Sequence, residues 1–170
     1  MASTKSQDAI ALLKDDHRKV EELFDQFEKA KGDERKQKLA LEICKELTVH
    51  TILEEEIFYP AIKGKVEDDL LKESFVEHDA AKVMIAEIEA GSPSDEYYDS
   101  KVKVLSEEIE HHVVEEEKPK EGLFAQTRAA DVDLKALGEQ MAARKEALMA
   151  EIDAKGLPAP EATTLEEVQL

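Results

Sequence analysis

The sequence predicts an all-helical protein: an antiparallel up-down four-helix bundle with an additional C-terminal helix and a flexible tail. Three observations predict this fold. Helix-forming Glu, Lys, Leu and Ala are abundant, whereas the 170 residues include only six glycines and five prolines. Apolar residues recur every three or four positions along several long stretches, as on one face of a helix. Short connections separate these stretches, so consecutive helices are expected to run antiparallel.

The first helix is predicted over residues 7–31. Ser6 or Asp8 is its expected N-cap, because either side chain can accept a hydrogen bond from a free backbone N–H, and Gly32 ends it. Its apolar stripe reads Ile10, Leu13, His17, Val20, Phe24, Phe27. The stripe therefore predicts that His17 faces the interior of the bundle.

The second helix is predicted over residues 33–63. Gly64 ends it, and Pro60 is expected to kink or break its last turn because proline lacks the backbone N–H that a helix needs. Its stripe reads Leu39, Ile43, Leu47, His50, Glu54, Ile57. Two polar residues, His50 and Glu54, thus replace consecutive core positions.

The third and fourth helices are predicted over residues 68–90 and 95–118, with a loop at the Gly-Ser-Pro-Ser sequence of residues 91–94. The third stripe contains Leu71, Phe75, His78, Lys82, Ile85. The fourth stripe contains Val102, Leu105, Ile109, His112, Glu116. Each of these helices also places one histidine on its inward face.

His111 and His112 are adjacent, so only one of them can face the bundle interior squarely. The apolar stripe of the fourth helix selects His112 and Glu116. The rival pair, His111 with Glu115, lies on a face with charge where the core should be. We therefore expect His111 to point outward or to lie behind the ligands.

Residues 1–130 are expected to form the bundle, and residues 131–154 to contain a C-terminal helix that packs on it. Residues 155–170 are rich in proline, threonine and glutamate, and we predict a disordered tail there.

The net charge of -18, from 41 acidic and 23 basic residues, argues against nucleic acid and anionic membranes as partners, because both are negatively charged. No segment approaches the ~20 apolar residues that span a bilayer, and no signal sequence is recognisable at the start, so a cytoplasmic location is the expectation. The single Cys44 excludes an intramolecular disulfide and a cysteine metal cluster. It is expected to be a small buried apolar side chain.

His17, His50, His78 and His112 lie near the middle of four different helices, so they can meet at one depth in the bundle. Residues four apart share a helix face, which pairs His50 with Glu54 and His112 with Glu116. Burying four imidazoles and two carboxylates costs several kcal/mol per ion unless something compensates them, and bound metal supplies that compensation. The alternative is that these side chains only form ion pairs with one another.

This donor set suits two metal ions. His17 and His50 would bind one ion and His78 and His112 the other, with Glu54 and Glu116 bridging them. Carboxylates bridging a metal pair inside a four-helix bundle favour two iron ions, with an oxo or hydroxo group as a further bridge; manganese and zinc fit less well. So few protein donors leave an open coordination position for a small ligand.

The remaining glutamates of the two motifs are expected to be solvated, because runs of charge usually form a water-facing surface. These residues are Glu55, Glu56, Glu115, Glu117. The alternative is that Glu55 or Glu115 lies behind the ligands and supports them. Tyr59, which follows the Glu54 motif, is expected to pack in the core, with a redox role as the alternative.

The chain resembles the hemerythrin family in its bacterial cation-binding form, the HHE domain. The resemblance spans residues 8–128 and follows the order His, His-x-x-x-Glu, His, His-x-x-x-Glu. The matching segments are Leu13-Lys14-Asp15-Asp16-His17, His50-Thr51-Ile52-Leu53-Glu54 to Pro60, Glu77-His78, and His111 to Glu117. It implies a four-helix bundle with a non-haem di-iron centre that binds O₂ and related ligands.

Lys82 departs from the pattern of oxygen-carrying hemerythrins, which have a further histidine at this position. A protonated lysine has no lone pair for iron, so reversible oxygen carriage is not expected. We expect the Lys82 side chain to extend along its helix toward solvent. The alternative is an ion pair with a bridging carboxylate.

These features predict a di-iron protein that binds or senses O₂, NO or peroxide, as a monomer or homodimer. The alternatives are a di-iron enzyme with oxidase, peroxidase or catalase-like activity, or an iron buffer. The sequence does not decide between a binding protein and an enzyme, because no substrate pocket is recognisable in it.

Overall fold

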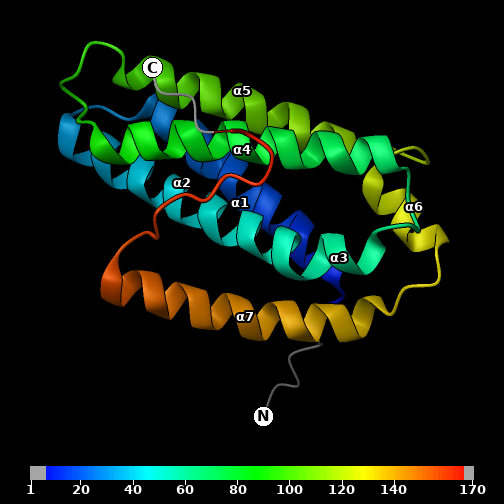
Figure 1. Ribbon diagram of the computed structural model, residues 1–170. Coiled ribbons are helices and arrows are strands. Elements are labelled where there is room, and N and C mark those ends of the chain that lie inside the picture. The colour runs from blue at the N-terminus through cyan, green and yellow to red at the C-terminus, as the bar shows by residue number, and fades with distance from the viewer. Residues whose placement is uncertain (1–6, 167–170) are drawn as a thin grey trace.

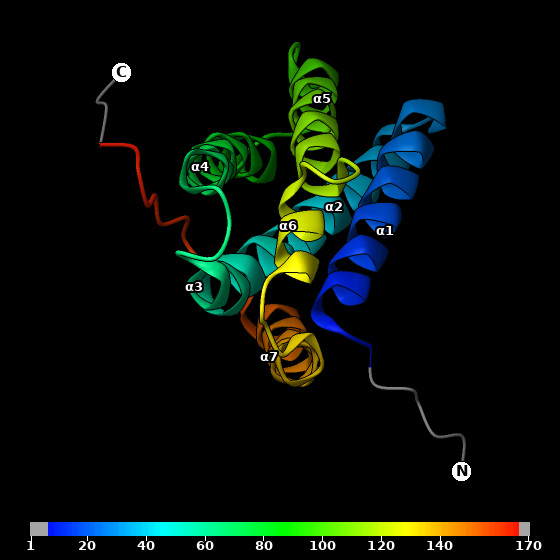
Figure 2. The same ribbon diagram turned by 90° about the vertical axis from the view of Figure 1, so that its right-hand side faces the viewer.

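The computed structural model describes residues 7–166, and every regular element within them is a helix, which confirms the all-α prediction. Four long antiparallel helices form the bundle (Figure 1): α1 (Ala9–Lys29), α2 (Asp33–Leu53), α4 (Asp68–Ala90) and α5 (Tyr98–Glu117). Around the bundle axis, α1 contacts α2 and α5, and α4 contacts the same two helices (Figure 2). Within the described part of the chain, none of the helices has the length and apolar character needed to cross a bilayer.

The start of α1 is fixed by Asp8, whose side chain accepts a hydrogen bond from the backbone N–H of Ala11 at 2.8 Å. Of the two predicted caps, Asp8 therefore serves, whereas Ser6 lies outside the described residues. Gly32, with φ of +89°, lies immediately before α2 in a backbone conformation that side chains rarely adopt.

Pro60 changes the helix type without breaking the helix. After α2 the chain continues as a π-helical turn, η1 (Glu54–Phe58), and then as α3 (Tyr59–Ile62). The backbone N–H of Tyr59 donates to the carbonyl of Glu54, five residues earlier. Proline cannot donate, and the wider turn accommodates this missing hydrogen bond. Residues five apart then share a face, so Tyr59 joins Glu54 on the inward side.

Two further helices follow the bundle. The short α6 (Leu123–Ala129), where the sequence predicted no helix, buries Leu123 and Phe124 beside α5. The long α7 (Leu134–Lys155) lies outside the bundle against α1 and α2. It approaches the start of α1 closely, because a Cβ added to Gly138 would lie 2.2 Å from the carbonyl oxygen of Gln7.

Residues 157–166, here called the strap, leave α7 and run back across the side of the bundle near α2 and α4 (red in Figure 1). They form no helix, but several of them hydrogen-bond to α4. Residues 167–170 of the predicted tail lie outside the described residues, and the predicted division at residues 130 and 154 stays a prediction.

The core consists of two apolar clusters with a polar layer between them. One cluster fills the end where α1 joins α2 and α4 joins α5, and includes Phe27, Leu39, Ile88 and Tyr98. The other fills the opposite end and includes Ile10, Leu13, Phe58, Leu123 and Met141. Buried histidines and carboxylates occupy the space between the clusters, where the predicted site lies.

Candidate metal centre

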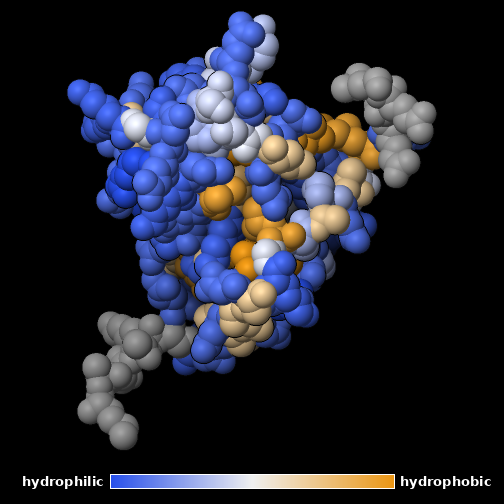
Figure 3. Space-filling view, turned by 90° about the vertical axis from the view of Figure 1, so that its left-hand side faces the viewer, coloured by the Kyte–Doolittle hydropathy of each residue, from blue (hydrophilic) through white to orange (hydrophobic). Residues whose placement is uncertain are grey.

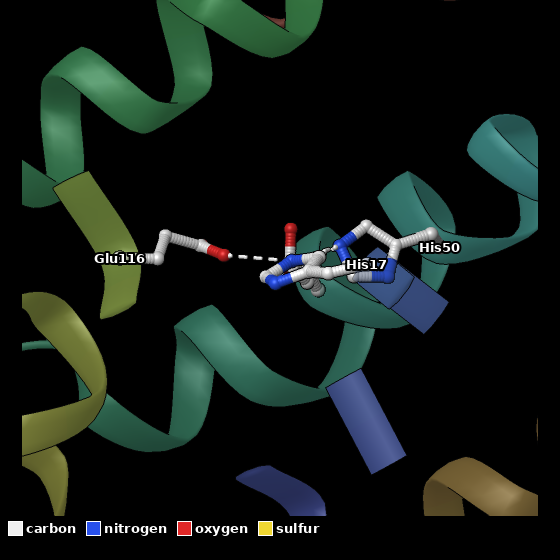
Figure 4. Close-up of side chains that lie close together, drawn as sticks. His17, His50 and Glu116 are labelled. Carbon is white, nitrogen blue, oxygen red and sulfur yellow. Dashed lines mark hydrogen bonds and ion pairs between the residues drawn. The ribbon is translucent and has the colours of Figure 1, made fainter. Parts of the chain in front are cut away.

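The six side chains predicted as metal ligands meet in this polar layer. His17 comes from α1, His50 from α2, Glu54 from η1 and His78 from α4, while α5 supplies His112 and Glu116. All six are at most 6% exposed. Figure 4 shows His17, His50 and Glu116 pointing toward one another from their three helices.

The donor atoms form two groups that could each hold one metal ion. The first group contains His17, His50, Glu54 and Glu116, and its donor atoms lie within 4.8 Å of one another. The second contains Glu54, His78 and His112 on the same criterion. Glu54 belongs to both groups, so its two carboxylate oxygens can serve two ions at once.

In each group two imidazoles present the same nitrogen to each other. The Nε2 atoms of His17 and His50 are 3.2 Å apart, and those of His78 and His112 are 3.3 Å apart. The two pairs have equivalent ring geometry, with ring centroids 4.9 Å apart and an interplanar angle of 59° in both. This repetition indicates two equivalent half-sites.

The other nitrogen of each imidazole, Nδ1, meets a carboxylate. These four residues, here called the outer carboxylates, are Glu117 for His17 (3.0 Å), Asp16 for His50 (3.2 Å), Glu55 for His78 (3.0 Å) and Glu77 for His112 (2.6 Å). Hydrogen-bonded carboxylates behind ligating histidines fix the ring orientation and make the imidazole a better donor.

The outer carboxylates also fix the proton positions. An ionised carboxylate only accepts hydrogen bonds, so each Nδ1 carries a proton and donates it. In a neutral imidazole the lone pair is then on Nε2. Two lone pairs facing each other at 3.2 or 3.3 Å repel, unless a proton or a metal ion lies between them.

In the metal-free chain, protons meet this need. Burial by itself disfavours the charged form of His50, but the negative charge of Glu54 and the hydrogen bond to Asp16 outweigh it and raise the pKa of His50 to about 10. Burial likewise opposes the charge of Glu54, but His50, His112 and His78 hold the pKa of the Glu54 carboxyl well below its usual value. The site is thus a buried cluster of charges that a divalent cation can replace.

Among the six predicted ligands, two buried carboxylate oxygens have no hydrogen-bond partner: Oε1 of Glu54 and Oε2 of Glu116. They lie near imidazole nitrogens, at 3.4 Å from His50 and 3.2 Å from His17 respectively, without the geometry of a hydrogen bond. Leaving such groups unsatisfied costs about 1–3 kcal/mol each. Metal coordination would satisfy both, so the donor set fits a metal pair.

Comparison with known proteins agrees with this geometry. The family model for the hemerythrin HHE cation binding domain matches residues 8–119. The chain belongs to this family. Together with the buried histidines and carboxylates, membership indicates that this HHE domain binds metal.

Two relatives of this HHE domain differ in what they share with it. The chain is 31% identical over 122 residues to a protein named DNA nickase from Nostoc sp. (strain PCC 7120 / SAG 25.82 / UTEX 2576). The alignment covers 72% of this chain but 33% of that protein. The chain thus spans about a third of that relative's length. The second is the crystal structure of a hemerythrin HHE cation binding domain-containing protein from Mycobacterium kansasii, an Rv2633c homolog. It superposes with a TM-score of 0.72 over 89% of this chain and 95% of that one at 23% identity, which shows a shared fold.

The outer carboxylates correct one sequence expectation about this HHE domain. Glu55 and Glu117 were expected to be solvated, but they are only 17% and 19% exposed and hold His78 and His17. Asp16 and Glu77 stood in the segments that carry the family resemblance, but no role was predicted for them. Each of the four outer carboxylates is adjacent in sequence to a predicted ligand, but the imidazole that it contacts belongs to another helix. Its role therefore depends on how the two helices pack against each other.

Lys82 corrects a second expectation. Its side chain does not extend freely into solvent: it is 15% exposed, and its ammonium group lies 2.9 Å from Glu55 and 3.2 Å from Asp79. The alternative, an ion pair with a bridging carboxylate, is also wrong, because neither partner belongs to the six predicted ligands. Lys82 instead neutralises the outer carboxylate of His78.

His111 lies outside the site, as its position on the helix predicts. It is 66% exposed and meets Glu77 at 3.2 Å, whereas His112 is buried among the other imidazoles. On α5, His112 and Glu116 therefore face the other predicted ligands, and His111 does not.

Tyr59 was expected to pack in the core, with a redox role as the alternative, and the structure places its hydroxyl at the site. Its hydroxyl lies 3.0 Å from Glu54, 2.9 Å from Glu116 and 3.2 Å from Nε2 of His78. Burial, followed by the charges of Glu116 and Glu54, raises its pKa well above the usual value, so the phenol keeps its proton in the metal-free chain. The signal in the sequence was Pro60, whose π-turn rotates Tyr59 inward.

A small internal cavity of about 20 Å³ lies beside the four histidines. Its remaining wall is mostly apolar and includes Val20, Leu47, Ala81, Ile109, Val113. This volume is close to that of a single water-sized molecule. The cavity therefore has room for one small molecule beside the histidines.

Proposed function

We propose that this chain holds two iron ions and uses them to bind a small ligand such as O₂, NO or peroxide. His17 and His50 would bind one ion, His78 and His112 the other, and Glu54 and Glu116 would bridge them. An iron pair held there would supply redox-active centres with an open coordination position.

One observation carries this proposal: the two donor groups share Glu54, and each contains a pair of imidazoles whose Nε2 atoms face each other. A zinc site typically uses four ligands around one ion and needs no shared carboxylate. Carboxylate-bridged pairs inside a helical bundle are the arrangement in which iron and manganese occur.

The surroundings favour a small neutral ligand. The apolar cavity beside the histidines has room for one small molecule, and Tyr59 holds a hydroxyl proton between the two carboxylates. The net charge of -18 gives no attraction for DNA. We therefore do not extend the name of the longer Nostoc relative to this chain.

The test is anaerobic reconstitution with ferrous iron, followed by metal analysis and absorption spectroscopy with and without NO. We expect two irons per chain and a spectrum that changes on adding NO. His112→Ala should lose iron and the spectral change, whereas His111→Ala, its exposed neighbour, should keep both. Equal behaviour of the two variants would contradict the assignment.

Peroxide turnover is a second candidate function, favoured by Tyr59. A neutral phenol within 3.2 Å of Glu54, Glu116 and His78 can give a proton to an oxygen ligand and take it back. We expect Tyr59→Phe to retain iron but to lose most of any peroxide consumption. If consumption is unchanged in this variant, the phenol has no part in it.

A further inference from the structure

A cavity of about 770 Å³ lies between α2, α4, α7 and the strap. Much of its wall is apolar, formed by Ile52, Phe75, Ile85, Leu148, Ile152 and Leu157. Figure 3 shows the end of the molecule where α7 passes into the strap, with apolar residues (orange) gathered among the polar helices. We call this cavity the chamber.

The chamber and the small cavity at the histidines share one wall residue, Thr51. Thr51 follows His50 on α2 and is 7% exposed. Among the described residues only Thr51 lines both spaces, so it separates the chamber from the small cavity at the histidines.

The strap is the outer wall of the chamber, and it is fastened at Asp79. The carboxylate of Asp79 is fully buried and accepts hydrogen bonds from the backbone N–H groups of Thr163, Thr164 and Leu165, at 2.9, 2.6 and 2.9 Å. It also accepts from the hydroxyl of Thr164 at 2.6 Å. Lys82 donates to the strap carbonyl of Glu161 at 2.9 Å. These contacts form a latch between the strap and α4.

We propose that the chamber is the route by which a small neutral ligand reaches the metal centre, with Thr51 as its inner gate and the latched strap as its lid. This inference rests on the proposed function. The chamber lining contains five glutamates but only two lysines and one arginine, so it carries a net negative charge. This charge disfavours anions, and a neutral ligand is therefore preferred.

A groove between α1 and α5, of about 440 Å³, also reaches the small cavity, at Ile109. Ile109 is 9% exposed and, as a larger side chain than threonine, leaves less room for passage. The chamber is the better route because its gate is smaller and its walls reach Glu55 beside His78. The groove provides the comparison in the experiment.

The gate is tested by stopped-flow binding of NO to the iron-loaded protein. Thr51→Ile adds bulk at the gate and is expected to slow binding about tenfold, or about 1.4 kcal/mol in the barrier. Thr51→Val keeps the shape and should bind at the wild-type rate, and Ile109→Phe should slow binding less than Thr51→Ile. Iron content, measured for each variant, separates access from metal loss.

The lid is tested in two ways. Deleting residues 157–170 should speed NO binding, since it uncovers the chamber. In the metal-free chain, hydrogen exchange at the amides of Thr163, Thr164 and Leu165 should be slow, and Asp79→Asn should make it faster.

Each outcome has a distinct meaning. If Thr51→Ile binds NO as fast as wild type, or if Ile109→Phe slows binding at least as much, the route is overturned. If the strap amides exchange as fast in wild type as in Asp79→Asn, the latch is overturned. If wild type loaded with iron forms no NO complex at all, the proposed function itself fails.

Discussion

Replacing Glu55 by glutamine is expected to weaken metal binding without touching any of the six proposed ligands. Glu55 accepts hydrogen bonds from Nδ1 of His78 at 3.0 Å and from Lys82 at 3.0 Å. Glutamine keeps an oxygen for the imidazole but loses the negative charge. His78 then becomes a weaker donor, because the charge behind the ring no longer supports it.

Loss of such a carboxylate typically costs about 10- to 100-fold in metal affinity, which corresponds to about 1.4–2.8 kcal/mol. The effect on folding should be smaller. Lys82 keeps Asp79 as a partner at 3.2 Å, so we expect the metal-free variant to lose about 1 kcal/mol of unfolding free energy.

The matched control is Glu56→Gln, one residue along. Glu56 is 51% exposed and pairs with Arg144, itself 38% exposed, so it should change stability by about 0–1 kcal/mol and leave metal affinity unaltered. Affinity is measured by anaerobic competition with a chelator, and stability by urea unfolding of the metal-free proteins. Equal iron affinities in the two variants would refute the role assigned to Glu55.

Three further predictions concern other parts of the molecule. Tyr59→Phe removes the hydroxyl donor of two buried carboxylates and should lower the unfolding free energy of the metal-free chain by about 1–3 kcal/mol in urea titrations; wild-type stability would contradict the hydrogen bonds described. Burial, with a contribution from Glu89, raises the pKa of Cys44 to about 12. The unfolded chain loses the thiol proton near pH ~8.5 while the folded chain keeps it, so stability should fall above that pH by up to about 1.4 kcal/mol per unit. Cys44→Ala should remove this part of the slope, and an identical slope in the variant would show that the thiol is not its source. Gly138→Ala would place a Cβ 2.2 Å from the carbonyl oxygen of Gln7 and should lower stability by about 1–3 kcal/mol in thermal unfolding; an unchanged melting temperature would mean that α7 does not approach α1 this closely.

Helical periodicity was sufficient to locate the six proposed ligands. The residues of each apolar stripe share one face of their helix, and that face packs against the bundle. A polar residue on the stripe is therefore carried into the core. The i, i+4 pairs His50–Glu54 and His112–Glu116 could therefore be read directly, and the choice of His112 over His111 followed from the same pattern.

The residues around the ligands depend on information that periodicity lacks. Asp16 and Glu55 reach imidazoles of neighbouring helices, so their roles depend on how those helices cross. Tyr59 lies on a face that an α-helix would turn elsewhere, and only the π-turn before Pro60 brings it inward. The contacts of the strap with Asp79 join residues more than 80 positions apart, which no local pattern predicts.

The central claim is that this bundle holds a pair of iron ions that share Glu54. An anomalous-difference map, collected at the iron absorption edge from crystals of the iron-reconstituted protein, tests it most directly. We expect two peaks about 3.5–4 Å apart, as in other two-metal sites, one beside His17 and His50 and the other beside His78 and His112, with Glu54 between them. A single peak, or no peak within reach of these imidazoles, would contradict the claim.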